Sequence, residues 1–358
     1  MNAPKLRFKE FNNLWQNEKL EDAVEFLDEK RKPIKDSDRN NIKGEYPYYG
    51  ASGIIDYIND YIFDEDLLLL GEDGANILSR STKLVFKATG KYWVNNHAHV
   101  LKPKENYNID FLESYLENIN YESYNTGTAQ PKLNQEVCKK INIKIPSLKE
   151  QEKIGKTLSL LDKKIELQAK KIEDLKLFKL CNYDNLFSNQ THEVQLKNIS
   201  KIEKGKQLNN ELLIENGSYY MLNGGVSPSG YTNEYNANEN TITISEGGNS
   251  CGYVNFNKNK FWCGGHCYKV IPNGINNNYL YHNLKYNEKK IMDLRVGSGL
   301  PNIQKKDIEN FKISIHNENE QLKISNYFDR YDLKIELEEL KLNKLIELKK
   351  GLMQNMFV

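Results

Sequence analysis

The sequence has no long apolar run, few cysteines and almost no net charge. Its longest notable apolar run, Leu67–Leu70, is far below the roughly 20 residues that a helix needs to cross a bilayer. The start, Met1–Phe8, has no apolar stretch after its basic residues, so we expect no secretory signal. Five cysteines, an odd number in 358 residues, argue against a disulfide framework. These absences predict a cytoplasmic protein that does not contact a membrane.

The near-balance of charges limits the possible partners. Fifty basic residues face 49 acidic ones, which gives a net charge of +1. A protein that binds a polyanion by bulk positive charge alone would have a large basic excess. The length of 358 residues, with 39% hydrophobic and 28% charged residues, indicates a globular chain of two domains.

The second half of the sequence repeats the first. Gly127–Leu133 aligns with Gly297–Ile303, and Asp162–Leu167 aligns with Asp332–Leu337, both at a shift of 170 positions. Between residues 121–187 and 291–357, 18 of the 67 ungapped pairs are identical, several times more than chance would give. The chain is therefore an internal duplication.

A looser match precedes these segments. Trp93-x-x-x-His97 corresponds to Trp262-x-x-x-His266 at a shift of 169, and Gly71–Gly74 resembles Ser245–Gly248. Around these motifs the residues differ almost completely. Each half therefore combines a variable globular part with a well-matched helical part, in the same order.

The helical parts have the pattern of a coiled coil. Their apolar positions repeat every 3.5 residues on average, and each row is interrupted at the same place, by Gln168 and by Glu338. The predicted seam consists of Ile154, Leu158, Leu161, Ile165, Ile172 and Leu175 in the first half and of Ile324, Phe328, Tyr331, Ile335, Leu342 and Leu345 in the second.

Two arrangements of these helices are possible. They could be buried in two separate domain cores, or they could pack on each other, antiparallel, between the globular parts. We favour the second, because a polar residue at the same seam position in both helices suits a pseudo-symmetric pair. Some 35 residues span roughly 50 Å, enough to hold two modules about one DNA turn, roughly 34 Å, apart.

The globular parts have the pattern of small α+β domains. Short predicted strands, broken by Gly, Asn, Pro and Ser turns, accompany one helical stretch in each half, near Ile109–Asn118 and near Tyr279–Lys289. The strands include Leu67–Leu70, Lys83–Lys87, His97–Leu101, Thr241–Ser245 and Tyr268–Ile271.

The turns of these parts concentrate side chains that can read base edges in a DNA groove. The candidates for DNA contact are Tyr48, Tyr49, Glu72, Asn95, Asn96, Thr126, Thr128, Gln130 and Lys132 in the first half, and Asn223, Glu246, Asn249, Arg295, Ser298 and Asn302 in the second. Glu72 and Glu246 could instead shape a turn.

Patterns that would indicate catalysis or a metal site occur in only one half of the repeat. Cys263 and Cys267 could be read as zinc ligands, but their repeat-equivalents are Val94 and Ala98, which predicts buried strand positions. Of the acidic residues between Asp64 and Asp73, the second half keeps only Glu246, so paired carboxylates would occur in one half only. We find no phosphate-binding loop, dinucleotide fingerprint or nucleophile elbow. We expect no catalytic residue and no metal ligand.

The order of these features resembles the specificity subunit of type I restriction–modification systems. The opening Pro4–Phe11 with Trp15 and Leu20 is similar to the usual start of that family, and Gly127–Leu133 with Ile145–Ile154 resembles the passage from its first target-recognition domain into its first conserved helix. The second half departs from the pattern, with His316-Asn317 where Pro146-Ser147 stands in the first.

The resemblance implies a reader of double-stranded DNA in which each target-recognition domain binds one half of a split site. It also implies that two modification subunits dock on this chain and methylate adenine, and that restriction subunits join through them. S-adenosylmethionine, ATP and Mg²⁺ would bind to those partners, and this chain would hold no cofactor. No Asn/Asp-Pro-Pro-aromatic motif occurs in the sequence, which agrees with this division of labour.

The predicted architecture is α+β, with two target-recognition domains separated by two long antiparallel coiled-coil helices in a pseudo-twofold internal repeat. The predicted boundaries are 1–149 and 189–319 for the domains and 150–188 and 320–358 for the spacer helices. Three alternatives stay open: the specificity module of another methyltransferase–nuclease type, a self-contained enzyme that uses Cys263 and His266 or the acidic loops, and a coiled-coil scaffold that binds no DNA.

Overall fold

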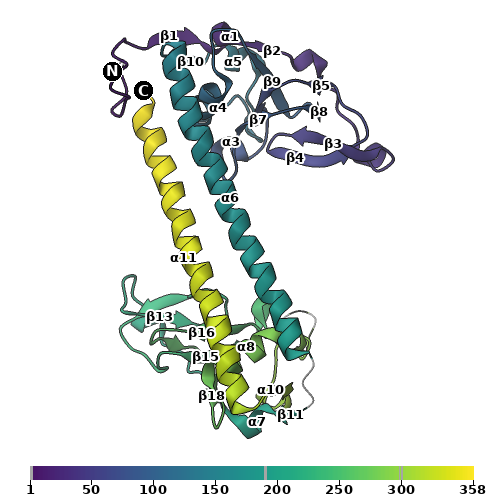
Figure 1. The fold of residues 1–358 in the computed structure, drawn as a ribbon, viewed down its shortest axis with the longest axis vertical. Helices are drawn as coiled ribbons and strands as arrows, with labels where there is room; N and C mark the ends of the chain where they lie inside the picture. The colour runs from purple at the N-terminus through teal and green to yellow at the C-terminus, as the bar shows by residue number, and fades with distance from the viewer. Residues whose placement is uncertain (1–2, 189–191, 298, 300) are drawn as a thin grey trace. The chain divides into compact units, whose positions relative to one another are not determined.

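The computed structural model describes residues 3–188, 192–297, 299 and 301–358 (Figure 1). The chain forms two compact units: unit 1 contains Met1–Ala169 and Lys341–Val358, and unit 2 contains Lys170–Leu340. The sequence analysis placed its boundaries at the ends of the long helices. The compact units instead divide within both helices, because each helix packs into both units.

The first half of the chain contains ten strands and six α-helices among its described residues. These are β1 (Gln16–Lys19), α1 (Leu20–Ala23), β2 (Val24–Phe26), α2 (Asp36–Arg39), β3 (Lys43–Gly50), β4 (Gly53–Ile58), β5 (Phe63–Asp64), β6 (Leu67–Gly71), α3 (Asn76–Ser79), β7 (Val85–Ala88), β8 (Lys91–Val94), β9 (Ala98–Pro103), α4 (Ile109–Glu117), α5 (Gln135–Lys139), β10 (Asn142–Ile145) and α6 (Leu148–Phe187).

The second half repeats this order in a shorter form. Its described elements are β11 (Glu193–Gln195), α7 (Leu196–Ile199), β12 (Ser200–Lys204), β13 (Tyr219–Leu222), β14 (Gly230–Thr232), β15 (Thr241–Ser245), β16 (Val254–Asn257), β17 (Trp262–Cys263), β18 (Cys267–Pro272), α8 (Asn277–Tyr286), α9 (Glu288–Met292), α10 (Lys305–Asn310), β19 (Lys312–Ser314) and α11 (Glu318–Met356). All five strands and both helical stretches that the sequence predicted as examples are present, shifted by at most a few residues.

Equivalent strands form equivalent sheets in the two units. The four-stranded sheet has the order β2-β9-β6-β7 in unit 1 and β12-β18-β15-β16 in unit 2. A second sheet, β4-β3-β8-β5, corresponds to β14-β13-β17, and the pair β1-β10 corresponds to β11-β19. The duplication seen in the sequence is therefore also a duplication of the fold.

The leucine run of β6 is explained by its position between two cores. Leu68 and Leu70 belong to one hydrophobic cluster of unit 1, whereas Leu67 and Leu69 belong to another. Successive side chains of a strand point to opposite faces of its sheet, so a strand covered on both faces is apolar throughout.

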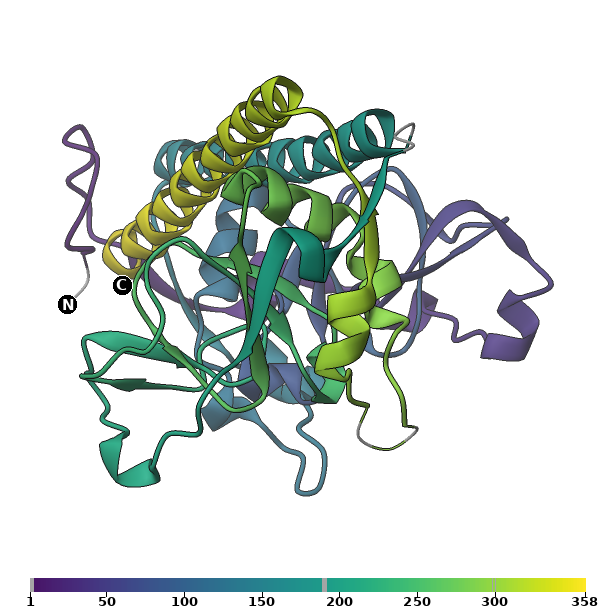
Figure 2. The same ribbon diagram turned by 90° about the horizontal axis from the view of Figure 1, so that it is seen from below.

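In each unit a short helix links the sheet to the long helices. The side chain of Asn108 caps α4 by accepting a hydrogen bond from Phe111 N at 3.0 Å, and Asn276 caps α8 in the same way through Tyr279 N at 2.9 Å. In unit 2, α8 lies beside the long helices (Figure 2). Leu280 of α8 packs on the sheet core, whereas Tyr279 packs on Phe328 and its neighbours in the long helices.

One buried glutamine attaches each long helix to that short helix. Gln151 Oε1 accepts from the backbone N–H of Asn108 at 2.9 Å, and its Nε2 donates to the Pro146 carbonyl at 3.0 Å. Gln321 repeats both contacts in unit 2, with Asn276 N at 3.2 Å and the His316 carbonyl at 2.8 Å. These contacts account for the glutamine of the Glu-Gln motif at the start of both helices.

A close approach of α6 and α4 explains Gly155. A Cβ atom at this position would lie 2.6 Å from Asn108 Oδ1 and 2.7 Å from Phe111 N, nearer than real Cβ contacts allow. The repeat-equivalent position in unit 2 holds Ser325, which is buried. In both units the long helix therefore packs against the short helix, and in unit 1 the approach is so close that only glycine fits at position 155.

In unit 1 the first part of α6 packs against the last part of α11. Ile154 and Leu158 share a hydrophobic cluster with Met356 and Phe357, and Asp162 forms an ion pair with Lys349 at 2.5 Å. Residue numbers rise along α6 as they fall along α11, so the two segments are antiparallel.

In unit 2 the last part of α6 packs against the first part of α11 in the same sense. The rings of Tyr183 and Phe328 lie 4.3 Å apart, Phe178 stacks on Tyr331, and Lys179 pairs with Asp332. The predicted antiparallel pairing is confirmed in each unit. The alternative of two helices buried in separate cores is wrong, because each helix contributes to both units.

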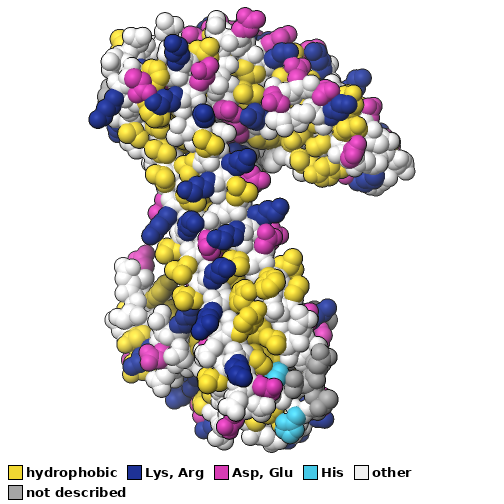
Figure 3. All heavy atoms as spheres, in the orientation of Figure 1, with side chains coloured by type: hydrophobic (Ala, Val, Ile, Leu, Met, Phe, Trp, Pro, Cys, Tyr) yellow, Lys and Arg dark blue, Asp and Glu magenta, His cyan; other side chains and the backbone are white. Residues whose placement is uncertain are grey.

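The predicted seam lies on the buried sides of these helices. All twelve seam residues are buried or half-buried, whereas Leu160, Leu167 and Leu333, which are off the seam, are more than half exposed. At the polar position of the seam, Gln168 is buried and Glu338 forms an ion pair with Lys171. Figure 3 shows Lys and Arg side chains gathered along the visible faces of α6 and α11.

The cysteines of the second half are core residues, as the repeat predicted. Cys263 ends β17 and Cys267 begins β18, and both are buried, like their equivalents Val94 and Ala98. No described helix is both long enough and apolar enough to pass through a membrane.

We expect Gln151→Ala to lower the free energy of unfolding by about 1–3 kcal/mol, because it leaves the Asn108 N–H and the Pro146 carbonyl without partners. Glu152→Ala, at the exposed neighbouring position, should change it by less than about 0.5 kcal/mol. Urea unfolding of both variants, with hydrogen exchange at the Asn108 amide, tests this. Equal effects would contradict it.

Candidate functional site

Three segments far apart in the sequence meet in unit 1. Glu72, just after β6, donates its backbone N–H to the His97 carbonyl at 2.9 Å, and its own carbonyl accepts from Leu133 N at 2.7 Å. The Gly74 N–H donates to the Pro131 carbonyl at 3.0 Å. We call this meeting point junction 1: Glu72–Gly74, Asn95–His97 and Asn125–Leu133.

Unit 2 builds the same meeting point with the same backbone bonds. The Glu246 N–H donates to the His266 carbonyl at 2.9 Å, the Glu246 carbonyl accepts from Ile303 N at 2.9 Å, and Gly248 N donates to the Pro301 carbonyl at 3.0 Å. We call it junction 2: Asn223, Glu246–Asn249, Gly264–His266 and the described residues of 295–303. The motifs that the repeat singled out therefore lie together in each unit.

The loop of junction 1 that ends at Leu133 is closed by a side chain. Asn125 Oδ1 accepts from the backbone N–H groups of Gly127 at 3.0 Å and of Lys132 at 2.9 Å. A Cβ at position 127 would lie 1.8 Å from the Gln130 carbonyl oxygen, so only glycine fits there. Thr128 and Gln130 lie at the exposed tip of this loop.

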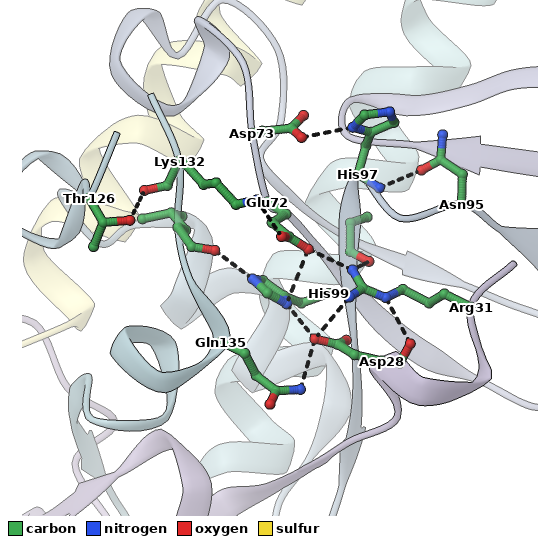
Figure 4. Close-up of polar contacts among 12 residues, drawn as sticks. Asp28, Arg31, Glu72, Asp73, Asn95, His97, His99, Thr126, Lys132 and Gln135 are labelled. Carbon is green, nitrogen blue, oxygen red and sulfur yellow. Dashed lines mark hydrogen bonds and ion pairs between the residues drawn. The ribbon is translucent and has the colours of Figure 1, made fainter. Parts of the chain in front are cut away.

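Glu72 is held by three cations in junction 1 (Figure 4). Arg31 Nη1 lies 2.7 Å from the carboxylate, Lys132 Nζ lies 3.2 Å away, and His99 Nδ1 lies 3.8 Å away. Burial alone would raise the pKa of Glu72, but the hydrogen bond from Arg31 and the charge of His99 outweigh it and lower the pKa. The carboxylate is therefore ionised and already saturated by partners.

His99 is the buried centre of this network. Its Nδ1 lies 2.6 Å from Asp28 Oδ2, and its Nε2 lies 2.7 Å from the Leu133 carbonyl oxygen (Figure 4). Because the ring can only donate to a carbonyl and to a carboxylate, both ring nitrogens carry protons. Burial would lower the pKa of His99, but the hydrogen bond to Asp28 and the charge of its carboxylate outweigh burial and raise the pKa to about 10.

Glu246 holds the same central position in junction 2 with different partners. Its carboxylate accepts from Lys204 Nζ at 2.6 Å and from the Tyr268 hydroxyl at 2.8 Å, and His266 Nδ1 lies 3.5 Å away. Burial would raise the pKa of Glu246, but Lys204 and Tyr268 outweigh it and lower the pKa. Tyr268 occupies the repeat-equivalent position of His99, so a neutral hydroxyl replaces a charged imidazolium.

The candidate residues that the sequence selected divide into two groups. In the first group, intramolecular contacts occupy the side chain. Asn95 Oδ1 accepts from His97 N at 2.8 Å, and its equivalent contact in junction 2 is Asn223 Oδ1 with His266 N at 3.1 Å. This group contains Glu72, Asn95, Thr126, Lys132, Asn223, Glu246 and Asn302. These side chains shape the junctions.

The second group is exposed at the junctions. Within the described ranges, these residues form no side-chain hydrogen bond or ion pair, so they are available to a ligand. They are Asn96, Thr128, Gln130, Asn249 and Arg295. Ser298, also a candidate, lies outside the described residues.

Tyr48 and Tyr49 are not at the surface of junction 1. Tyr48 is buried, and its hydroxyl accepts from Ile34 N at 2.9 Å. Tyr49 stacks on Phe86 within the core, and only its carbonyl reaches the junction, where it accepts from Asn95 N at 3.0 Å.

Sequence reasoning missed Arg31 and Lys204, which lie nearest to the central glutamates. Arg31 in unit 1 and Lys204 in unit 2 have the same role, but they lie 173 positions apart, in segments that an ungapped comparison at 169 or 170 does not align. Within the part of the chain that the structure describes, no group of three or more His, Cys, Asp or Glu side chains is arranged to hold a metal ion.

Comparison with known proteins identifies the family. The model of the type I restriction modification DNA specificity domain matches residues 12–177 and again residues 189–348. The chain belongs to this family. The two matches correspond to the two halves of the duplication.

Individual relatives agree with this family. A Haemophilus influenzae protein described as a type I restriction enzyme specificity subunit is 37% identical over 142 residues, which are 40% of this chain and 36% of that protein. A type I specificity subunit of Mycoplasma pneumoniae is 36% identical over 172 residues, 47% of this chain and 44% of the relative. The chain thus spans less than half the length of these relatives.

A solved structure shares the fold over the whole chain. The crystal structure of the type I restriction–modification S subunit from M. genitalium matches with a TM-score of 0.77 and 20% identity, over 99% of each chain. The fold described above is therefore shared with that S subunit over almost the whole length of both chains.

We expect His99→Gln to destabilise unit 1 by about 1.5–3 kcal/mol at neutral pH, because it removes the charged hydrogen-bond donor of the buried Asp28 and leaves Arg31, at 3.4 Å, as the charged partner. The folded-state pKa of His99 is above its ordinary value of 6.5, so the stability it contributes is fully present below pH 6.5 and is lost as the pH rises through about 10. The difference in unfolding free energy between wild type and variant should shrink over that range.

Denaturant unfolding at pH 6, 8 and 10 measures this difference. Tyr268→Phe is the matched control in unit 2, since the phenol has a pKa raised by burial and stays neutral over this range. A His99→Gln effect that does not change with pH would show that the imidazole is uncharged.

Proposed function

We propose that this chain is the non-catalytic DNA-recognition subunit of a type I restriction–modification complex, with each junction reading one half of a bipartite site. The observation that carries this proposal is the duplicated junction: one backbone frame occurs twice and presents different exposed side chains each time. Two identical backbone frames would allow both units to dock on a duplex in a similar way, and their different side chains would allow them to read two different half-sites.

The chemistry of the exposed residues supports base reading. Gln130 can form a bidentate pair with adenine, Arg295 can form one with guanine, and Asn96 and Asn249 can likewise pair with adenine. By contrast, the saturated carboxylates of Glu72 and Glu246 favour the role of shaping a turn over that of accepting from cytosine.

We further propose that the paired helices set the gap between the half-sites and that two modification subunits dock on this chain. Restriction subunits would join through them. Adenine methylation and DNA cleavage would be carried out by those partners, which would bind S-adenosylmethionine, ATP and Mg²⁺. A continuous helix of 40 residues is about 60 Å long, well above one turn of DNA.

Exchanging the first target-recognition domain should change one half-site and leave the other. The graft should cover residues 16–147. It has to include β1 and β2, because β1 pairs with β10 and β2 pairs with β9. Methylome sequencing of cells that carry the exchanged chain and its modification subunit reads out both half-sites. A change in both would contradict the proposal, and a graft of residues 193–317 should change only the other half-site.

Removing one heptad from each long helix should shorten the gap by about three base pairs, because seven helical residues rise about 10 Å and stacked base pairs are about 3.4 Å apart. Leu167–Glu173 and Leu337–Asn343 are repeat-equivalent heptads whose removal keeps the phase of the seam. Replacing both with unrelated coiled-coil heptads is the matched control and should leave the gap unchanged. An unaltered gap after the deletion would exclude a spacer role.

A further inference from the structure

The Trp-x-x-x-His motif of each half includes a tryptophan that the junctions do not use. Trp93 Nε1 donates to the Lys32 carbonyl at 2.6 Å, and Trp262 Nε1 donates to the Lys206 carbonyl at 2.8 Å. Both indoles therefore bind the backbone of a lysine in a segment that sequence comparison did not align.

A second backbone bond completes the same clamp in both units. Lys32 N donates to the Val94 carbonyl at 3.3 Å, and Lys206 N donates to the Cys263 carbonyl at 2.9 Å. Val94 and Cys263 are repeat-equivalent residues at the ends of β8 and β17. Lys32 and Lys206 are thus structural equivalents, each with its N–H and its carbonyl fixed by the strand that enters the junction.

The side chains of these two lysines are exposed, and within the described residues neither has an acidic partner. Their neighbours differ in this respect: Arg31, one residue before Lys32, and Lys204, two residues before Lys206, are bound to the central glutamates. Each unit therefore places a cation that is bound to the central glutamate close in sequence to an exposed lysine that has no acidic partner among the described residues.

The surroundings of Lys206 are rich in lysine, although Lys204 and Lys305 are paired with Glu246 and Glu309. A groove of about 470 Å³ in unit 2 is lined by Lys201, Lys204, Lys206, Lys269 and Lys305. Glu203 is the one acid that lines it, and it is bound to Lys201 and Lys269. The groove and junction 2 share Lys204.

We propose that Lys32 and Lys206 are a matched pair of phosphate-binding residues, one in each unit, each of which binds the DNA backbone beside the bases that its junction reads. Trp93 and Trp262 are positioning residues that fix the lysine backbones. The ligand is a phosphodiester, because an ammonium group at the end of a flexible chain binds a phosphate as a point charge, without reading a base. This inference rests on the proposed function.

The occurrence of the clamp in both units favours DNA over an acidic protein surface. Almost all loop residues differ between the halves, yet the same lysine is clamped in the same way in both. A contact that is independent of sequence is expected to be common to two readers of different half-sites, since every half-site has the same phosphates.

The test uses the full chain assembled with its modification subunits and a duplex that contains the bipartite sequence found by methylome sequencing. Lys32→Gln and Lys206→Gln should each weaken binding about 8-fold at 0.1 M salt and make the slope of log K against log salt shallower by about 0.9. The double variant should lower the slope by about twice that amount, with the preferred half-sites unchanged.

Three further variants make the result specific. Lys140→Gln in unit 1 and Lys289→Gln in unit 2 remove exposed lysines that lie outside the clamps, and both should retain the wild-type slope. Lys206→Arg keeps the charge and should retain it as well. Because all these positions are exposed, none of the substitutions should impair folding.

The outcomes separate this inference from the proposed function. If the wild-type complex binds the duplex specifically but Lys32→Gln and Lys206→Gln match the Lys140 and Lys289 controls, the lysine pair is refuted and the recognition role stands. Weakened association with the modification subunits at an unchanged salt slope would assign the lysines to a protein contact and also refute it. A wild-type complex without sequence preference would refute both proposals.

Discussion

The attachment of each long helix to its domain by one buried amide is the constraint on which the rest of the structure depends. Gln151 and Gln321 each bind the cap of a short helix and the carbonyl of the residue that ends the preceding segment. An amide can satisfy both groups only in one orientation, so the helix leaves each unit in a defined direction relative to the sheet of that unit.

The junctions show how one frame can support two specificities. Their shape comes from backbone hydrogen bonds, which any side chain permits, and from a central glutamate that cations neutralise. Residues at the exposed tips, such as Gln130 and Asn249, can therefore vary without loss of the frame. The partners that hold the glutamate also vary, since His99 in unit 1 corresponds to Tyr268 in unit 2.

The clamped lysines extend this division between constant and variable parts. Lys32 and Lys206 are constant in position although their segments differ in length, because the tryptophan binds a carbonyl group rather than a side chain. This equivalence is set by hydrogen bonds between residues that are far apart in the sequence. In the sequence itself, only the tryptophan and the lysine are common to the two clamps.

The sequence by itself determined the duplication, the two α+β parts, the antiparallel helix pair and the repeated motifs from which the junctions are built. Periodicity and repeats are local patterns, and Glu72 and Glu246 stand out because they recur within motifs. Only the tertiary structure decided which polar side chains of the described residues are occupied by intramolecular contacts: Asn95 is, and its neighbour Asn96 is not. Only the tertiary structure showed that Arg31 and Lys204 are equivalent. The pairings of Arg31 with Glu72 and of Lys204 with Glu246 join residues 41 and 42 positions apart across loops of unequal length, so they depend on the folded backbone and not on spacing along the chain.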